Sequence, residues 1–166
     1  MTLPPSFTTR LVDLDTAPAA ALPWMTLDQS ATATIRATTG TLPQVQILHS
    51  GDSVTDAWLP TPWEVNHPCF ARHISLNLGQ HACLIGRSIA QADGEVATLL
   101  KGLGTRPLAE LLFKDGSTAL PEPIYLVSDQ GWFGRAVQWQ VAGCADPLLL
   151  IELFNPEFVS RYAPTA

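Results

Sequence analysis

The chain has 166 residues and a mass of 17.9 kDa, enough for one domain whose core needs neither disulfides nor a metal. Apolar residues make up 46% of it and charged residues 14%, which excludes a disordered protein. The net charge of −6, with nine scattered Lys and Arg residues, excludes a basic surface that follows phosphates, so we expect no nucleic-acid partner.

The first residues do not resemble a secretory signal. Residues 1–24 have no early basic cluster, and prolines and aspartates interrupt their apolar stretches. The longest apolar run, residues 148–151, is far too short to span a bilayer. The three cysteines are an odd number without a framework spacing, which suits a reducing compartment. We therefore expect a cytoplasmic monomer with no stable membrane insertion.

The N-terminal part predicts an arm followed by a helix. Residues 1–23 contain several prolines and are predicted to form an irregular arm, and residues 24–166 to form a single domain. A helix is predicted over residues 27–38, although its threonines weaken it. Gly40 would end this helix.

One strand and one loop are predicted next. Apolar and polar residues alternate over residues 44–48, which predicts a strand that stops at a Ser-Gly-Asp turn at residues 50–52. A proline-rich loop follows at residues 59–63.

Two longer strands come after the loop, over residues 70–78 and 81–90. They are joined only by Gly79 and Gln80. A two-residue connection that contains glycine predicts a hairpin, so these strands should be antiparallel.

Two helices should follow the hairpin. Residues 95–103 form a helical stretch that Gly104 would close. Thr105 would then cap a second, short helix with Pro107 in its first turn. Its apolar stripe consists of Leu108, Leu111 and Leu112.

The C-terminal part predicts three more strands, over residues 124–128, 135–141 and 148–154. Antiparallel hairpins with helices in two blocks indicate an α+β fold.

Four of these strands carry a charged residue among their apolar ones. Side chains alternate between the two faces of a strand, so a charged residue with the parity of its apolar neighbours points to the core. The four residues are Arg72, Arg87, Arg135 and Glu152. The hairpin would let Arg72 and Arg87 face the same cavity. Burying such a charge unpaired costs several kcal/mol, so the pattern predicts an internal anion site.

Simpler explanations exist for each position alone. A long arginine can bend its charged group out to water, and an inward Arg and Glu can pair with each other. The agreement of four segments favours a polar pocket inside an apolar sheet, which is the usual composition of a small-molecule site.

Other chemistry has weaker signals. His67 with Cys69, and His81 with Cys83, form two His-x-Cys pairs that zinc could accept. The separation of the pairs does not fit a zinc motif and buried cysteines are commonly inert, so we predict no metal site. The sequence has no phosphate-binding glycine loop and no Gly-x-Ser-x-Gly motif. We therefore expect binding or chemistry without a cofactor.

The start of the predicted short helix offers one more anion contact. The first N–H groups of a helix are unpaired and its dipole is positive there, so the amide of Leu108 could receive a carboxylate. An ordinary solvated helix start would explain the same residues.

In combination, these residues resemble the chorismate lyase family, also called 4-hydroxybenzoate synthases. The resemblance covers roughly residues 24–156. The matching stretches are Arg72 and Arg87 with their spacing of fifteen, Leu-Gly-Thr-Arg-Pro-Leu at 103–108, Asp-Gln-Gly-Trp-Phe-Gly-Arg at 129–135 and Leu-Leu-Leu-Ile-Glu-Leu-Phe-Asn-Pro at 148–156.

The resemblance implies an antiparallel sheet of about six strands, with helical flaps over a buried site and no cofactor. It implies that Arg72 and the amide of Leu108 hold the ring carboxylate of the substrate, while Glu152 contacts a ring hydroxyl. The family often has Met where Ala31 stands, so Ala31 is expected to contact the substrate and to leave the flap looser.

The implied reaction is the elimination that converts chorismate to 4-hydroxybenzoate and pyruvate, the first step of ubiquinone-type quinone biosynthesis. Arg72, Glu152 and Arg87 are the expected catalytic residues, and Arg87 or Arg135 would meet the enolpyruvyl carboxylate. Glu152 would either orient the hydroxyl or neutralise an inward arginine.

An alternative is binding without turnover. The fold also resembles effector-binding domains of some bacterial repressors, which bind small acids. Those domains normally follow a DNA-binding domain, for which residues 1–23 are too short, so the enzyme is favoured.

Overall fold

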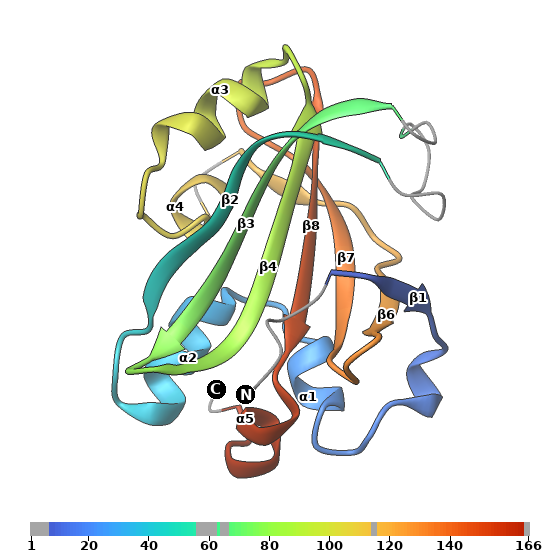
Figure 1. Cartoon of the computed structure of the whole chain (residues 1–166), viewed down its shortest axis with the longest axis vertical. Coiled ribbons are helices and arrows are strands. Elements are labelled where there is room, and N and C mark those ends of the chain that lie inside the picture. The colour runs from blue at the N-terminus through green and yellow to red at the C-terminus, as the bar shows by residue number, and fades with distance from the viewer. Residues whose placement is uncertain (1–6, 56–62, 64–66, 114–115, 165–166) are drawn as a thin grey trace.

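The computed structural model describes residues 7–55, 63, 67–113 and 116–164, and its centre is one antiparallel sheet (Figure 1). The strands are β1 (Thr9–Leu11), β2 (Gln44–Val54), β3 (Pro68–Leu78), β4 (His81–Gln91), β5 (Thr118–Ala119), β6 (Ile124–Ser128), β7 (Phe133–Gln140) and β8 (Pro147–Phe154). Their order is β1-β6-β7-β8-β4-β3-β2, and β5 pairs with β7. The predicted α+β domain with an antiparallel sheet is confirmed. The sheet is larger than expected because β1 and β5 join it.

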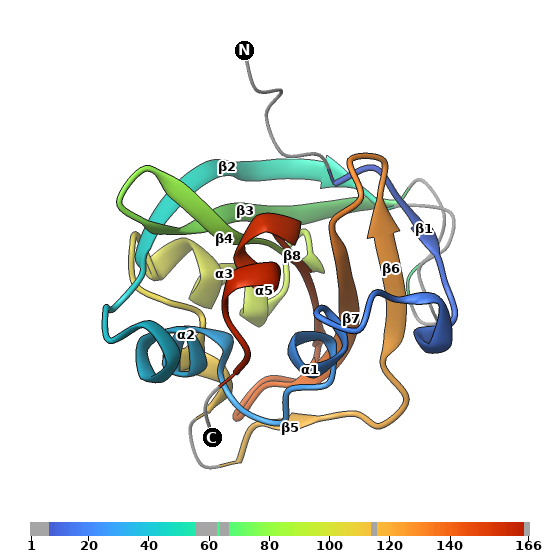
Figure 2. The same cartoon turned by 90° about the horizontal axis from the view of Figure 1, so that it is seen from below.

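The helices of the described part are α1 (Leu22–Met25), α2 (Ala31–Thr39), α3 (Glu95–Gly102), α4 (Ala109–Leu112) and α5 (Pro156–Arg161), with a 3₁₀ turn, η1, at Leu14–Thr16. Seen from below, the sheet is bent, and α1, α2, α3 and α5 lie on the inner side of the bend (Figure 2). Helices packed on one face of an antiparallel sheet are a common α+β arrangement.

Apolar side chains fill both sides of the sheet. On the inner side, Trp24 and Ile35 from α1 and α2 pack near the β3–β4 turn, while Leu100 of α3 packs near the other end of these strands. The outer side is closed by a cluster that includes Ile89 and Trp63. Because burial of apolar area is the main favourable term in folding, the sheet is stabilised from both faces.

Helix α2 is held by its caps. The predicted helix over residues 27–38 forms, but it begins only at Ala31, because Ser30 Oγ accepts the N–H of Ala33 at 3.2 Å and caps the helix. The predicted end is confirmed, since Gly40 has a φ of 76° in the left-handed region. Residues 27–30 are therefore a loop.

The connection from α3 to α4 differs from the prediction. Helix α3 forms where expected, but Thr105 does not cap α4, whose N-cap is Leu108. The N–H of Arg106 donates to the carbonyl oxygen of Leu103, so the chain makes another turn directly after α3. Helix α4 is consequently only four residues long.

Two edge segments are more regular than predicted. The N-terminal arm of residues 1–23 is not irregular throughout, because β1 pairs with β6. The turn predicted at residues 50–52 is wrong: β2 continues to Val54, since it pairs with β3 along its whole length, apart from a bulge between Ile47 and His49. Strand pairing here overrides local turn propensity. The proline-rich loop of residues 59–63 lies outside the described residues except for Trp63.

The β3–β4 hairpin forms with the predicted two-residue turn, but its register changes just after the turn. Asn77 pairs with Ala82, whereas Leu76 pairs with Leu84, so that Cys83 is an extra residue in β4. A one-residue shift turns every later residue of the strand to the opposite face.

This bulge separates the two arginines of the hairpin. If the pairing of Leu78 with His81 and of Asn77 with Ala82 continued along both strands, Arg72 would pair with Arg87. After the bulge, Arg72 pairs with Ser88 and Arg87 pairs with His73. The two arginines therefore lie on opposite faces of the sheet, and the prediction that they share a cavity is wrong.

Gly134 in β7 lies too close to β8 for any side chain. A Cβ atom at this position would lie 1.7 Å from the carbonyl oxygen of Glu152. We expect Gly134→Ala to lower the free energy of unfolding by about 3 kcal/mol or more, because the two strands must separate. Urea unfolding measures this loss.

The matched control is Gly102→Ala in α3, where a Cβ would meet nothing within 4 Å. This variant should be as stable as the wild type or slightly more so, since Ala is the better helix former. Equal stability of the two variants would contradict the close pairing of β7 and β8.

Candidate functional site

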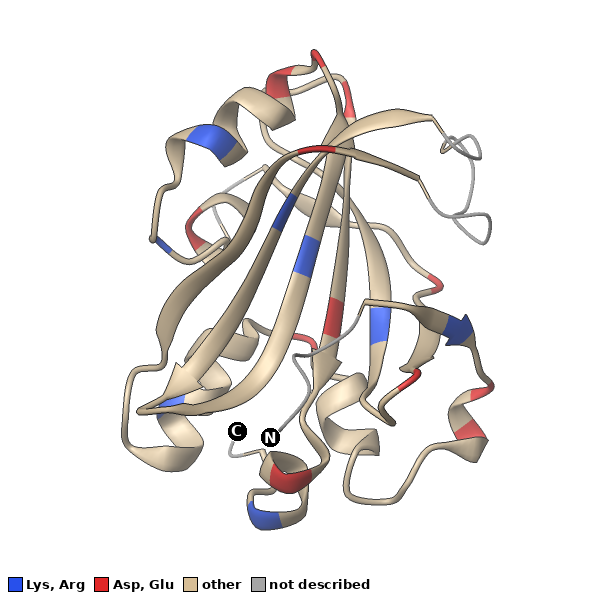
Figure 3. Ribbon diagram, in the orientation of Figure 1, with Lys and Arg blue, Asp and Glu red and all other residues tan. Residues whose placement is uncertain are grey.

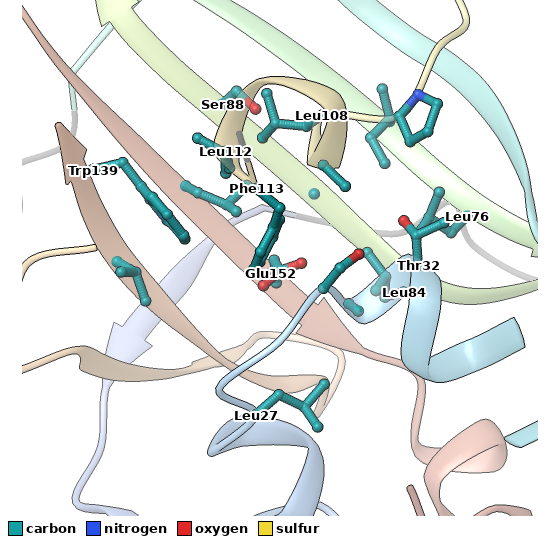
Figure 4. Close-up of a pocket in the computed structure, with 18 of the residues that line it drawn as sticks. Leu27, Thr32, Leu76, Leu84, Ser88, Leu108, Leu112, Phe113, Trp139 and Glu152 are labelled. Carbon is teal, nitrogen blue, oxygen red and sulfur yellow. The ribbon is translucent and has the colours of Figure 1, made fainter. Parts of the chain in front are cut away.

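A cavity of about 140 Å³ lies between the inner face of the sheet and helices α2 and α4 (Figure 4). Strands β3, β4, β7 and β8 form its floor. Its walls are mostly apolar and include Leu27, Ile74, Leu76, Leu84, Leu108, Leu112, Val137 and Leu150. An engineered apolar cavity of roughly 150 Å³ admits one benzene ring, so this space suits a single aromatic ring.

Arg72 brings a buried positive charge to the floor of the cavity. Its side chain is 2% exposed, and its Nη2 donates to the carbonyl oxygens of Gly104 at 3.1 Å and Arg106 at 2.9 Å. Burial lowers the pKa of the guanidinium from its ordinary value. No carboxylate within the described residues forms an ion pair with Arg72. A buried cation without an acidic partner favours the binding of an anion.

Arg135 and Glu152 form an ion pair on the same floor. They are direct partners in the β7–β8 register, with Arg135 Nη2 3.7 Å from Glu152 Oε1, and each side chain is 13% exposed. Arg135 Nη1 also donates to the carbonyl oxygens of Leu27 and Met25. An inward Arg and an inward Glu therefore pair with each other at Arg135 and Glu152, as the simpler explanation predicted. Arg72 has no such partner among the described residues.

The charge state of Glu152 depends on two opposing effects. Burial raises the pKa of its carboxyl above the ordinary value, and the positive charge of Arg135 acts in the opposite direction. Burial is the larger effect. Burial therefore favours the neutral form of this carboxyl, and the nearby charge of Arg135 favours the ionised form.

Arg87 lies outside the cavity. It is buried on the outer face, where its Nη2 approaches Ser53 Oγ at 3.4 Å and the carbonyl oxygen of Val54 at 3.3 Å. Burial, together with the charges of Arg87 and His49, lowers the pKa of His73 to about 4. The prediction that Arg87 belongs to the site is not supported by this geometry, because the bulge at Cys83 reverses its face. Figure 3 shows basic positions within β3, β4 and β7 and an acidic position in β8.

The two other predicted site residues do line the cavity. Ala31 stands at the start of α2, and Leu108 stands just before α4. The N–H of Leu108 makes no hydrogen bond with the part of the chain that the structure describes. Leu108 and Arg72 thus lie at the same wall, since Arg72 binds the carbonyl of Arg106 two residues before Leu108.

Sequence reasoning missed an aromatic side of the cavity. Phe113 and Trp139 both line it, and their rings meet edge to face with centroids 5.5 Å apart (Figure 4). Trp139 has the same parity as Arg135 in β7, so the alternation that identified Arg135 would have identified it too. Phe113 follows α4 and is half exposed, which places it at the edge of the cavity.

The two His-x-Cys pairs do not come together. His67 and Cys69 lie at the open end of the β3–β4 hairpin, whereas His81 and Cys83 lie beside its turn. Among the described residues, no group of three or more His, Cys, Asp or Glu side chains could hold a metal ion.

Comparisons with known proteins give no family assignment: no family model matches the chain, and no curated protein matches it. No helix within the described ranges is long and apolar enough to cross a membrane. The functional interpretation therefore depends on the cavity itself.

The raised pKa of Glu152 predicts a pH-dependent stability. A carboxyl group whose pKa is raised by folding stabilises the protein most below its unfolded-state pKa, and this contribution is lost as the pH rises through the folded-state value. Relative to Glu152→Gln, which does not titrate, the wild type should therefore gain thermal stability as the pH falls from the neutral range to the ordinary glutamate pKa of about 4.3.

Melting temperatures of both proteins across this range measure the effect. Glu157→Gln, the same change at an exposed position of α5, serves as the reference. If the wild type instead lost stability relative to Glu152→Gln at lower pH, the attraction of Arg135 would outweigh burial.

Proposed function

We propose that the protein converts chorismate to 4-hydroxybenzoate and pyruvate without a cofactor, as the resemblance to chorismate lyases implies. The observation that carries the proposal is Arg72, a buried guanidinium with no acidic partner in the described chain, in an apolar cavity of about 140 Å³. A cation at one end of a ring-sized apolar space is complementary to an aromatic carboxylate.

The cavity residues have distinct roles in this proposal. Arg72 and the amide of Leu108 anchor the ring carboxylate. Glu152, on the floor of the same cavity, orients the C4 hydroxyl. Arg135, not Arg87, meets the enolpyruvyl carboxylate, because Arg135 lines the cavity and Arg87 lies on the other face of the sheet.

The reaction itself requires positioning more than strong acid or base. The ring loses its C4 hydrogen as a proton, the bond between C3 and the ether oxygen breaks, and the departing enolpyruvate becomes pyruvate on protonation. Aromatisation of the ring drives the step. Holding the substrate in one orientation supplies much of the rate enhancement, and a guanidinium near the leaving group stabilises its developing charge.

The same geometry favours strong product binding. 4-Hydroxybenzoate keeps the carboxylate and the hydroxyl that position chorismate, so Arg72 and Glu152 contact both molecules. The product is enclosed between the sheet and helices α2 and α4, and its release is therefore expected to limit turnover.

A specific observation favours binding without turnover as the second candidate. Glu152 already pairs with Arg135, so the lining has one positive charge in excess when the exposed Asp28 is set aside. This charge matches a monoanion such as 4-hydroxybenzoate, whereas chorismate has two carboxylates. A sensor of small aromatic acids would have the same cavity.

We expect purified protein to form 4-hydroxybenzoate and pyruvate in equal amounts from chorismate, with no added metal or nucleotide. The absorbance of 4-hydroxybenzoate and a coupled assay of pyruvate measure both products. Tight binding of 4-hydroxybenzoate without any turnover would favour the sensor, and loss of activity on chelation would require a metal site.

Arg72→Met should weaken 4-hydroxybenzoate binding by about 2–5 kcal/mol, because it removes a buried charge-assisted hydrogen bond while keeping an apolar side chain of similar length. Isothermal titration calorimetry measures this affinity. Melting curves establish that the variant is folded at the temperature of the titration.

Arg87→Met is the matched control, since Arg87 is an equally buried arginine one strand away on the opposite face. Its affinity for 4-hydroxybenzoate should stay within about twofold of the wild type. Equal losses in the two variants would show that Arg72 does not contact the ligand.

A further inference from the structure

The ionisable side chains of the cavity allow its charge to be counted. Of the lining residues that are not exposed, Arg72 and Arg135 are positive and Glu152 is negative, so these three have a net charge of +1 when all are ionised. Asp28, from the loop between α1 and α2, also lines the cavity but is exposed, so water and salt screen its charge. The count matches one carboxylate, and a ligand with two carboxylates brings one negative charge too many.

A second carboxylate would have to compete with Glu152. The described cation other than Arg72 that lines the cavity is Arg135, which is already the register partner of Glu152. The separation of 3.7 Å between Arg135 Nη2 and Glu152 Oε1 is longer than a tight ion-pair hydrogen bond of about 2.8 Å. A ligand carboxylate on Arg135 would therefore lie beside that of Glu152.

Two carboxylates that share one guanidinium in a poorly solvated site do not both stay ionised. Repulsion between them and loss of water favour the protonated form of one. Once Glu152 is neutral, the ligand carboxylate has no charged competitor for the guanidinium of Arg135, whose Nη1 stays bonded to the carbonyls of Leu27 and Met25. Protonated Glu152 can then donate a hydrogen bond to either ligand oxygen or remain neutral against the apolar wall.

We propose that the cavity binds dianionic acids together with one proton, which Glu152 accepts, and binds monoanionic aromatic acids without proton uptake. The inference deepens the proposed function, on which it rests for the nature of the ligand. A ring carboxylate on Arg72 leaves the ion pair intact, because β4 separates β3 from β8 and Arg72 is not a register partner of Glu152. Chorismate thus enters with a proton and 4-hydroxybenzoate leaves without one.

No other described side chain with a titratable charge faces Glu152 across the cavity. Arg135 faces it from β7, Arg72 lines the floor on β3, and Asp28 lines the cavity but is exposed. Helix α2 contributes Ala31 and Thr32, while the ionisable Glu110 of α4 pairs with Arg106 at the surface. Proton uptake within the cavity is therefore assigned to Glu152.

The test is titration calorimetry with two probes in buffers of different ionisation enthalpy. 4-Hydroxybenzoate is the monoanion, and 3-(carboxymethoxy)benzoate is a dianion with an ether-linked carboxylate that does not react. Carboxyl groups of both probes ionise near pH 4, so they stay charged between about pH 6.5 and 8. The dependence of the measured enthalpy on buffer gives the number of protons bound.

We expect about one proton per dianion and about none per monoanion. The affinity for the dianion should rise by about tenfold for each unit that the pH falls, as linkage to one proton requires. Glu152→Gln should bind the dianion without proton uptake and with no such pH dependence. Glu157→Gln, at an exposed position of α5, should keep the wild-type behaviour.

Several results would overturn the proposal. These are dianion binding without proton uptake in the wild type, unchanged uptake in Glu152→Gln, and binding of 4-hydroxybenzoate with no binding of the dianion. The wild-type measurement decides even if Glu152→Gln does not fold. Proton-coupled binding in a protein that releases no pyruvate from chorismate would refute the enzymatic function and leave this inference standing.

Discussion

The arrangement of the molecule around its cavity depends on one buried guanidinium. Arg72 lies in the middle of β3 and hydrogen-bonds to the carbonyls of Gly104 and Arg106, so it ties the α3–α4 connection to this strand. That connection carries Leu108 and α4 over the cavity. The charge of Arg72, which no described carboxylate offsets, also makes the space below attractive to an anion. Arg72 thus determines both the position of α4 over the cavity and the preference of the cavity for an acid.

The ion pair of Arg135 and Glu152 differs from Arg72 in its consequences. Its two charges nearly cancel, so the pair adds little to the attraction for one carboxylate. The pair instead makes the charge of the cavity adjustable, because burial favours the neutral form of Glu152 and Arg135 favours its ionised form. Because Arg72 and the pair of Arg135 and Glu152 line the same cavity, the cavity can distinguish ligands of different charge.

Much of this could be predicted from the sequence, since alternation within a strand is a local property. It correctly placed Arg72, Arg135 and Glu152 on an apolar face. The relation between strands could not be predicted in the same way, because the bulge at Cys83 has no sequence signal that we recognised. The register of the two-residue turn therefore predicts the wrong face for Arg87. The capping of α2 by Ser30 and the extension of β2 through its predicted turn show, likewise, that pairing and capping contacts decide boundaries that propensity leaves open.

The bulge in β2 has a consequence for self-association. Strand β2 is at the edge of the sheet, and two of its apolar residues at the bulge, Ile47 and Leu48, are exposed. A long regular edge of this kind is a template for aggregation through added strands. The bulge between Ile47 and His49 breaks the edge into two shorter runs whose hydrogen-bonding groups are out of step. An incoming strand could form hydrogen bonds with one of these runs but not with both. The bulge therefore opposes aggregation of the protein at high concentration.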